Sequence, residues 1–98
     1  MTASASTPPL DVLTIGRCGI DVYPLQTGVG LEDVESFGKF LGGSPTNVAV
    51  AAARYRHRSA VITGVGDDPF GRFVRREMRQ LGVYDDYVVT KADFLTPL

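Results

Sequence analysis

The 98-residue sequence is poor in the residues that disulfide frameworks and metal sites require. It contains one cysteine, Cys18, and one histidine, His57. A single thiol cannot form an internal disulfide, and a reducing compartment suits such a chain, so we expect a cytoplasmic protein. Structural metal sites gather several Cys and His ligands, so the sequence predicts no metal site of its own.

Charge of one sign and long hydrophobic runs are also missing. The net charge of −1 provides no overall attraction for nucleic acid or for an anionic membrane. The longest purely apolar run, residues 48–53, is too short to span a bilayer. A hydrophobic fraction of 44% with 21% charged residues is typical of a globular protein. We therefore expect one small domain at most, with neither nucleic acid nor a membrane as partner.

The order of apolar runs and turn signals predicts an α/β fold. Residues 11–16 and 59–65 are typical of buried strands, and residues 87–90 predict a third strand. The broken pattern of residues 19–41 indicates short, partly exposed strands. Strand, insertion, helix, strand, helix and strand in this order favour a parallel sheet with right-handed crossovers.

Two helices are predicted from their start signals. A hydroxyl N-cap at Ser44 precedes Pro45, and Asp68 precedes Pro69 in the same way. The second helix carries apolar residues on one face and is expected to end at Gly82. Its four arginines lie away from that face and predict a solvated surface: Arg72, Arg75, Arg76 and Arg79. The first helix is expected to end after Tyr55, where Arg56 occupies a position that favours glycine.

The predicted elements do not make a complete domain. Three strands and two helices would leave one sheet edge and much of one face uncovered, so we expect the front part of a larger domain. Residues 1–10 have neither the positive start nor the apolar core of a signal peptide, and they predict a flexible leader.

The stretch FLGGSPTNVAV, residues 40–50, is the first candidate site. Gly42 and Gly43 remove the Cβ barrier, the following helix start offers unpaired N–H groups, and Asn47 adds a donor and an acceptor. The spacing alone leaves two interpretations open: a tight turn into a capped helix, or a cradle for a polyhydroxylated or anionic ligand.

Two further segments invite a functional interpretation. Asp21 follows the first strand, where α/β folds place their ligands, and its carboxylate can accept hydrogen bonds from two sugar hydroxyls. The alternative for Asp21 is a turn-forming role. The second glycine-rich junction, residues 64–71, does not match the dinucleotide fingerprint because Pro69 holds its last position, so we expect structural capping there.

Taken together and in this order, these segments resemble the N-terminal part of the ribokinase-like (PfkB) carbohydrate kinases. The resemblance rests on GRCGID at residues 16–21, on GGSPTN at 42–47 with the alanine-rich helix, and on GDDPFG at 66–71. It covers residues 11–98, and long blocks are similar to a family member that phosphorylates an acid sugar in inositol catabolism. It implies a Rossmann-type parallel sheet with a small β lid within about residues 20–41.

The resemblance also implies roles for particular residues. The family's sugar-binding acid falls on Asp21, its di-glycine on Gly42 and Gly43, and its substrate-binding asparagine on Asn47. Arg17 is a candidate partner for a substrate carboxylate. The implied substrate is a small sugar acid, with ATP and Mg²⁺ as cofactors of the full-length protein. The lid strands would also form a homodimer contact.

Three departures from the family pattern refine this picture. Gly19 and Ser44 stand where ribokinase has asparagine and lysine, which fits an acid sugar better than ribose. The catalytic Gly-Ala-Gly-Asp motif is expected farther along a longer chain, so no catalytic residue is assigned here. Residues 64–67, GVGD, mimic that motif but lack its Asp-Thr lead-in. Alternatives are a fructokinase, a 2-keto-3-deoxygluconate kinase, a non-catalytic carbohydrate-binding module, or a nucleotide-binding Rossmann half.

Overall fold

The computed structural model describes residues 9–98. Residues 1–8 of the predicted leader lie outside the described residues. A parallel sheet forms the body of the structure. Its strands are β1 (Val12–Ile15), β4 (Ser59–Gly66), β5 (Val83–Tyr84) and β6 (Val88–Lys91). Strand β4 is central: β1 pairs along one edge, while β5 and β6 pair with successive halves of the other. The predicted strands are confirmed, and the two-residue β5 is too short to show a pattern in sequence.

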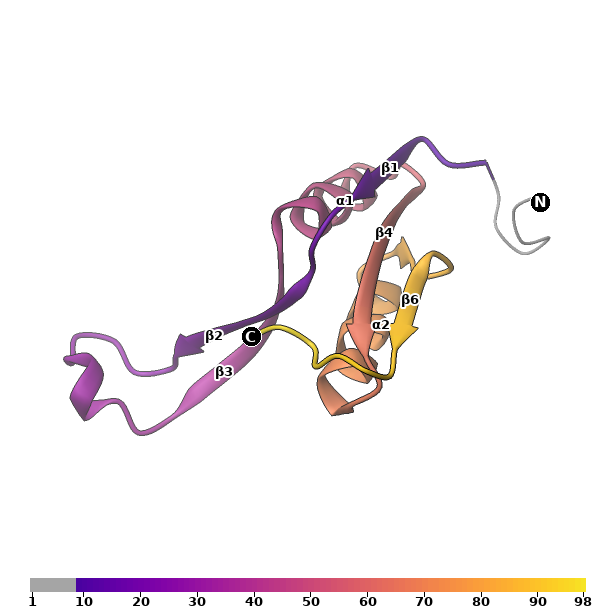
Figure 1. Cartoon of the computed structure of the whole chain (residues 1–98). Coiled ribbons are helices and arrows are strands. Elements are labelled where there is room, and N and C mark those ends of the chain that lie inside the picture. Colours follow the sequence, from indigo (N-terminus) through magenta and orange to yellow (C-terminus); the bar gives the residue numbers. More distant parts are fainter. Residues whose placement is uncertain (1–8) are drawn as a thin grey trace.

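An antiparallel hairpin leaves this sheet between β1 and the first helix. It consists of β2 (Gly19–Pro24) and β3 (Phe37–Gly42), with Gly19 opposite Gly42 and Pro24 opposite Phe37. A 3₁₀ turn, η1 (Leu31–Asp33), lies in the loop between the strands. Figure 1 shows the hairpin as a long arm that projects away from the sheet. The short, partly exposed strands predicted for this region are therefore present.

Two helices cover the same face of the sheet (Figure 1). Helix α1 (Ser44–Arg54) packs on β1 and β4, and α2 (Pro69–Gln80) packs on β4 and β5. The core lies between the helices and β4, where Val61, Val74 and Met78 are fully buried. Ser59 Oγ on β4 donates to the Ala49 carbonyl of α1 at 2.7 Å, which ties α1 to this face. Within residues 9–98, neither helix combines the length and the apolar content needed to cross a bilayer.

The opposite face of the sheet is open, as expected from the small number of elements. Ile15 is 75% exposed and Val89 50% exposed, and Leu13 and Ile62 are also exposed there. Ile15 lies beside Ile62 in the parallel register, so these side chains form a continuous apolar strip. The prediction of a buried strand over residues 11–16 was wrong in this respect, because α1 covers only one face of β1.

The two helix starts differ in their chemistry. At α2 the prediction is confirmed, since the Asp68 carboxylate accepts a hydrogen bond from the Gly71 N–H at 2.7 Å. At α1 the N-cap is Gly43 and no side chain caps the helix, so the N-cap predicted at Ser44 was wrong. Gly43 has φ of +100°, which glycine adopts without strain. The glycine therefore sets the entry angle of α1, and Ser44 becomes its first helical residue.

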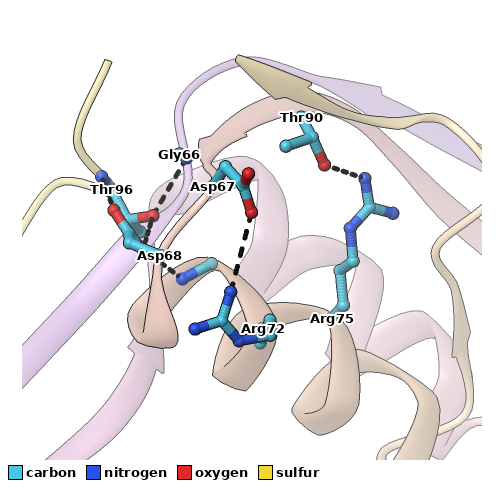
Figure 2. A network of polar contacts seen from close by, with 8 residues as sticks. Gly66, Asp67, Asp68, Arg72, Arg75, Thr90 and Thr96 are labelled. Atoms are coloured by element: carbon cyan, nitrogen blue, oxygen red, sulfur yellow. Dashed lines mark hydrogen bonds and ion pairs between the residues drawn. The ribbon is translucent and has the colours of Figure 1, made fainter. Parts of the chain in front are cut away.

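Asp68 also clasps the C-terminal segment (Figure 2). It accepts hydrogen bonds from the Thr96 N–H at 2.9 Å and the Thr96 hydroxyl at 2.7 Å. The Thr96 hydroxyl oxygen in turn accepts from the Gly66 N–H at 3.0 Å. These bonds, led by the one from the Thr96 backbone, lower the pKa of Asp68. Residues 97–98, the C-terminal strap, follow Thr96 and reach the hairpin. There the Ile20 N–H donates to the Pro97 carbonyl at 2.9 Å.

Arg75 has a structural role that corrects part of the prediction for the α2 arginines. Its guanidinium donates to the Asp85 and Val88 carbonyls and to the Thr90 hydroxyl, the last at 2.9 Å (Figure 2). It also lies 3.7 Å from the Asp85 carboxylate. Arg75 therefore holds the connection between β5 and β6 against α2, because only a long side chain from the helix edge can reach those carbonyls.

Arg56 adopts the left-handed conformation that its position after α1 requires. Its φ is +67°, and it is the only non-glycine residue with a positive φ among those described. The prediction that position 56 favours glycine is thus confirmed. A Cβ in this conformation approaches its own carbonyl group, so the turn into β4 carries strain.

Replacing Arg56 with glycine should stabilise the chain. Relief of the left-handed strain is expected to raise the free energy of unfolding by about 1 kcal/mol. Urea unfolding followed by circular dichroism measures this difference. Arg54→Gly is the control, because it places glycine inside α1 and should lower stability by a similar amount. Equal or lower stability of Arg56→Gly would contradict the interpretation.

The clasp at Asp68 predicts a specific dependence of stability on pH. Because its pKa is lower in the folded state, ionised Asp68 stabilises the fold at neutral pH. This contribution should disappear as the pH falls below about 4 and passes through the lowered pKa. Asp68→Asn should lower the urea midpoint at pH 7 and lose less stability between pH 5 and pH 3 than the wild type.

Asp67→Asn is the matched control for this experiment. The Asp67 side chain is 67% exposed and pairs only loosely with Arg72, at 3.6 Å, so its replacement should leave the urea midpoint at pH 7 almost unchanged. Parallel pH curves for the two variants would show that the clasp does not contribute.

Candidate functional site

A hollow of about 310 Å³ lies where the hairpin leaves the sheet. Three elements meet there: the connection from β1 to β2, the start of α1, and the C-terminal strap. The carboxyl end of a strand and the N-terminus of a helix therefore face the same space, as in ligand sites of α/β proteins. The lining residues are Arg17, Cys18, Gly19, Ile20, Asp21, Gly43, Ser44, Pro45, Pro97 and Leu98.

The two glycines before α1 allow this hollow to form. A Cβ at Gly43 would contact the Arg17 carbonyl oxygen and lie 2.9 Å from the Cys18 Cα. A Cβ at Gly42 would overlap the Asp21 carboxylate. Backbone contacts and the positive φ thus require glycine at position 43, while glycine at position 42 leaves room for the Asp21 carboxylate. The tight turn into α1 is therefore present, and the ligand cradle, the other alternative, stays a prediction.

Asp21 and Arg17 bring opposite charges to the hollow without neutralising each other. The Asp21 carboxylate is half-buried and accepts a hydrogen bond from the Tyr23 hydroxyl at 3.3 Å. The Arg17 side chain is exposed, and in residues 9–98 it forms neither an ion pair nor a hydrogen bond. A carboxylate that can accept from hydroxyls and a guanidinium that can pair with an acid are the groups that recognise an acidic polyol.

Asn47 does not join these residues. Its side chain is exposed and lines a neighbouring groove with Phe40, Arg54, Glu77 and other residues of β3, α1 and α2. Pro45 lines the hollow, and Asn47 lies two residues or about 200° farther around the helix axis, beside Glu77 of α2 in the neighbouring groove. The structure thus groups Arg17, Asp21 and the two glycines and leaves Asn47 apart.

Several residues that line the hollow or contact its lining were not singled out from the sequence. Tyr23 lies two residues after Asp21, and strand alternation is the signal that places both on one face. Pro97 and Leu98 line the hollow because the C-terminal strap crosses to the hairpin. Gly19 lacks the side chain that would block them, because a Cβ there would lie 2.8 Å from the Pro97 carbonyl oxygen. The strap contact thus explains the glycine at position 19.

Cys18 contributes to the wall and not to chemistry. Its side chain is 1% exposed, and burial raises the pKa of the thiol, partly opposed by a hydrogen bond with the Thr63 side chain. A raised pKa keeps the sulfur protonated near neutrality, and the thiol, unlike the thiolate, is a poor nucleophile.

The second glycine-rich junction is occupied by internal contacts. The Gly66 N–H donates to Thr96 and the Gly71 N–H to Asp68, so these donors are not available to a phosphate. Structural capping, predicted for residues 64–71, is confirmed. Within residues 9–98, no three acidic, histidine or cysteine side chains gather in the way a metal ion requires. The described residues therefore provide no cluster that would hold a metal ion through protein ligands alone.

Comparisons with known proteins agree with this geometry. 5-Dehydro-2-deoxygluconokinase of Photobacterium profundum is 38% identical over 82 residues, which are 84% of this chain and 25% of the relative. A sugar kinase of Pyrococcus horikoshii, solved in complex with ATP, superposes with a TM-score of 0.79 at 35% identity, over 87% of this chain and 28% of that one. For 2-dehydro-3-deoxygluconokinase of Thermotoga maritima the TM-score is 0.75 at 25% identity, over 81% and 24% of the chains.

The chain spans about a quarter of the length of the curated relative that it matches. The family model for pfkB family carbohydrate kinases matches residues 10–98, which is nearly the whole sequence. This match, together with the superposition on solved sugar kinases, shows that the chain belongs to the pfkB family of carbohydrate kinases.

Proposed function

We propose that this chain forms the sugar-binding part of a kinase that transfers the γ-phosphoryl group of ATP to the terminal hydroxyl of 5-dehydro-2-deoxygluconate. The observation that carries the proposal is the hollow itself, where Asp21 and Arg17 present opposite charges that the described chain does not neutralise. The name of the Photobacterium relative supports the choice of substrate. A sugar acid offers both complementary groups, hydroxyls for the carboxylate and a carboxylate for the guanidinium.

Each residue of the hollow has a distinct part in binding. Asp21 accepts hydrogen bonds from two sugar hydroxyls, and Arg17 pairs with the substrate carboxylate. Gly42 leaves the space that the Asp21 side chain fills, and Gly43 brings the start of α1 to the same hollow. A role for Asn47 in substrate binding rests on the resemblance to the family, since its side chain lines the neighbouring groove.

The phosphoryl donor and its metal ion belong to residues outside this stretch. ATP and Mg²⁺ are the expected cofactors of the full-length enzyme, in which the metal neutralises charge on the transferred phosphoryl group. Because residues 9–98 provide no cluster of metal ligands and none of the family's catalytic motif, we assign them no step of the transfer. Their contribution is orientation: a bound hydroxyl held in place lowers the entropic cost of the reaction.

A 2-dehydro-3-deoxygluconate kinase is the second candidate. It is favoured by the likeness to the Thermotoga enzyme and by the same pair of charges, because that substrate is also a sugar acid. A fructokinase fits less well, since fructose has no carboxylate for Arg17. A non-catalytic carbohydrate-binding module would use the same hollow without any transfer.

Assembly and location remain predictions. The hairpin face that points away from Asp21 exposes Val22 and Phe37. Both residues lie on the strands that are expected to form a homodimer contact. Apolar side chains exposed on such an arm are typical of interaction surfaces. A cytoplasmic location is predicted from the lone cysteine.

The purified chain should bind 5-dehydro-2-deoxygluconate without phosphorylating it. Calorimetry should detect binding, while a coupled assay with ATP and Mg²⁺ should show no turnover. Asp21→Ala should abolish binding, because it removes the acceptor for two hydroxyls. Turnover by this chain would contradict the assignment of the catalytic groups to other residues. Absence of sugar binding would contradict the proposed function.

Arg17 should determine the preference for an acid over a neutral sugar. Arg17→Gln is expected to weaken binding of 5-dehydro-2-deoxygluconate roughly tenfold, because one charge-assisted contact is lost. Binding of fructose should change little. Arg54→Gln removes an exposed arginine from the neighbouring groove and is the control in the same calorimetric series. An equal loss for both sugars in Arg17→Gln would show that Arg17 does not contact the carboxylate.

A further inference from the structure

One face of the hairpin carries few side chains. Alternation along β2 places Gly19, Asp21 and Tyr23 on the same face, and the register of β3 places Gly42, Phe40 and Gly38 opposite them. Three of these six positions are glycine. The remaining three side chains, an acid and two aromatic rings, therefore have room to lean along the hairpin.

The glycines determine in which direction each side chain leans. The Asp21 carboxylate lies over Gly42, where a Cβ would overlap it. The Phe40 ring lies over Gly38, since a Cβ there would be 3.0 Å from the ring carbon Cε2. Phe40 thereby meets the Tyr23 ring on the diagonal, with ring centroids 5.6 Å apart and a tilt of 56°. A tilted pair at this separation is a favourable aromatic contact.

The Tyr23 ring, held in this way, directs its hydroxyl at the acid of the hollow. The hydroxyl donates to Asp21 Oδ2 at 3.3 Å. This is the one hydrogen bond to the Asp21 side chain among the contacts of residues 9–98. The bond is longer than the usual O–H···O separation, and hydrogen bonds of unliganded sites shorten when the ligand is bound.

We propose that Tyr23 is a positioning residue that sets the orientation of Asp21 for the sugar. Phe40 holds the Tyr23 ring, and the Tyr23 hydroxyl uses one acceptor site of the Asp21 carboxylate. The remaining acceptor sites are left for the two sugar hydroxyls. This role rests on the proposed function only where it concerns the sugar. The orientation of Asp21 by Tyr23 is a property of the chain without ligand and is testable separately.

The first test uses the chain without sugar. Side-chain coupling constants from NMR report whether the Asp21 χ1 angle occupies one rotamer or several. We expect one dominant rotamer in the wild type and averaged couplings in Tyr23→Phe, which keeps the ring and removes only the hydroxyl. Tyr55→Phe is the matched control, since Tyr55 is 80% exposed and lies at the far end of α1. Unchanged Asp21 couplings in Tyr23→Phe would overturn the proposal.

The second test is a double-mutant cycle on binding of 5-dehydro-2-deoxygluconate, measured by calorimetry. Tyr23→Phe should weaken binding about three- to tenfold in the wild-type background. In the Asp21→Asn background the same substitution should have no further effect, because Tyr23 acts through Asp21. Equal losses in both backgrounds would show a direct contact or a general structural role and would overturn the proposal.

The two tests separate failure of this inference from failure of the proposed function. If the wild-type chain binds no sugar acid, the proposed function fails, while the couplings still decide whether Tyr23 orients Asp21. If the chain binds sugar and the couplings do not respond to Tyr23→Phe, the function stands and the positioning role is rejected. Thermal unfolding of each variant shows whether the fold is retained, and loss of the fold in Tyr23→Phe would itself argue for a structural role.

Discussion

At Gly43 the chain turns into α1 while its backbone lies against the connection between β1 and β2. A side chain at this position would collide with the Arg17 carbonyl and the Cys18 Cα, and the positive φ excludes most other residues. The direction of α1, the departure of the hairpin and the opening of the hollow all depend on this contact. Since α1 starts there without a side-chain cap, its first residues border the space that Asp21 and Arg17 share.

A second set of contacts completes the wall of the hollow from the other end of the chain. Asp68 caps α2 and accepts hydrogen bonds from Thr96, and the Pro97 carbonyl that follows accepts a hydrogen bond from the Ile20 N–H of β2. Glycine at position 19 gives this strap room. The hairpin is thus attached both to the start of α1 and to the start of α2. The base of the hairpin is attached to the rest of the chain, while its far end projects away from the sheet (Figure 1).

The arrangement separates stability from binding. The core between the helices and β4 is closely packed, and the opposite face of the sheet exposes an apolar strip. Charged groups that serve the fold are paired within the chain, as Arg75 is with Asp85. Arg17 and Asp21 form no ion pair with each other, although they line one hollow. Both side chains therefore keep hydrogen-bonding capacity that contacts within residues 9–98 do not use.

The sequence by itself determined the two helices and the strands other than β5, because strand and helix patterns and the Asp68-Pro69 start are local. It also predicted Asp21, Gly42 and Gly43 as candidate site residues, and it indicated the left-handed position of Arg56. The tertiary structure decided which of these residues meet. Asn47 borders the neighbouring groove and not the hollow, and Gly43, not Ser44, is the N-cap of α1. Pro97 lies against Gly19, although the two are 78 positions apart in the sequence. Such placements depend on contacts between distant segments, and local patterns carry no information about them.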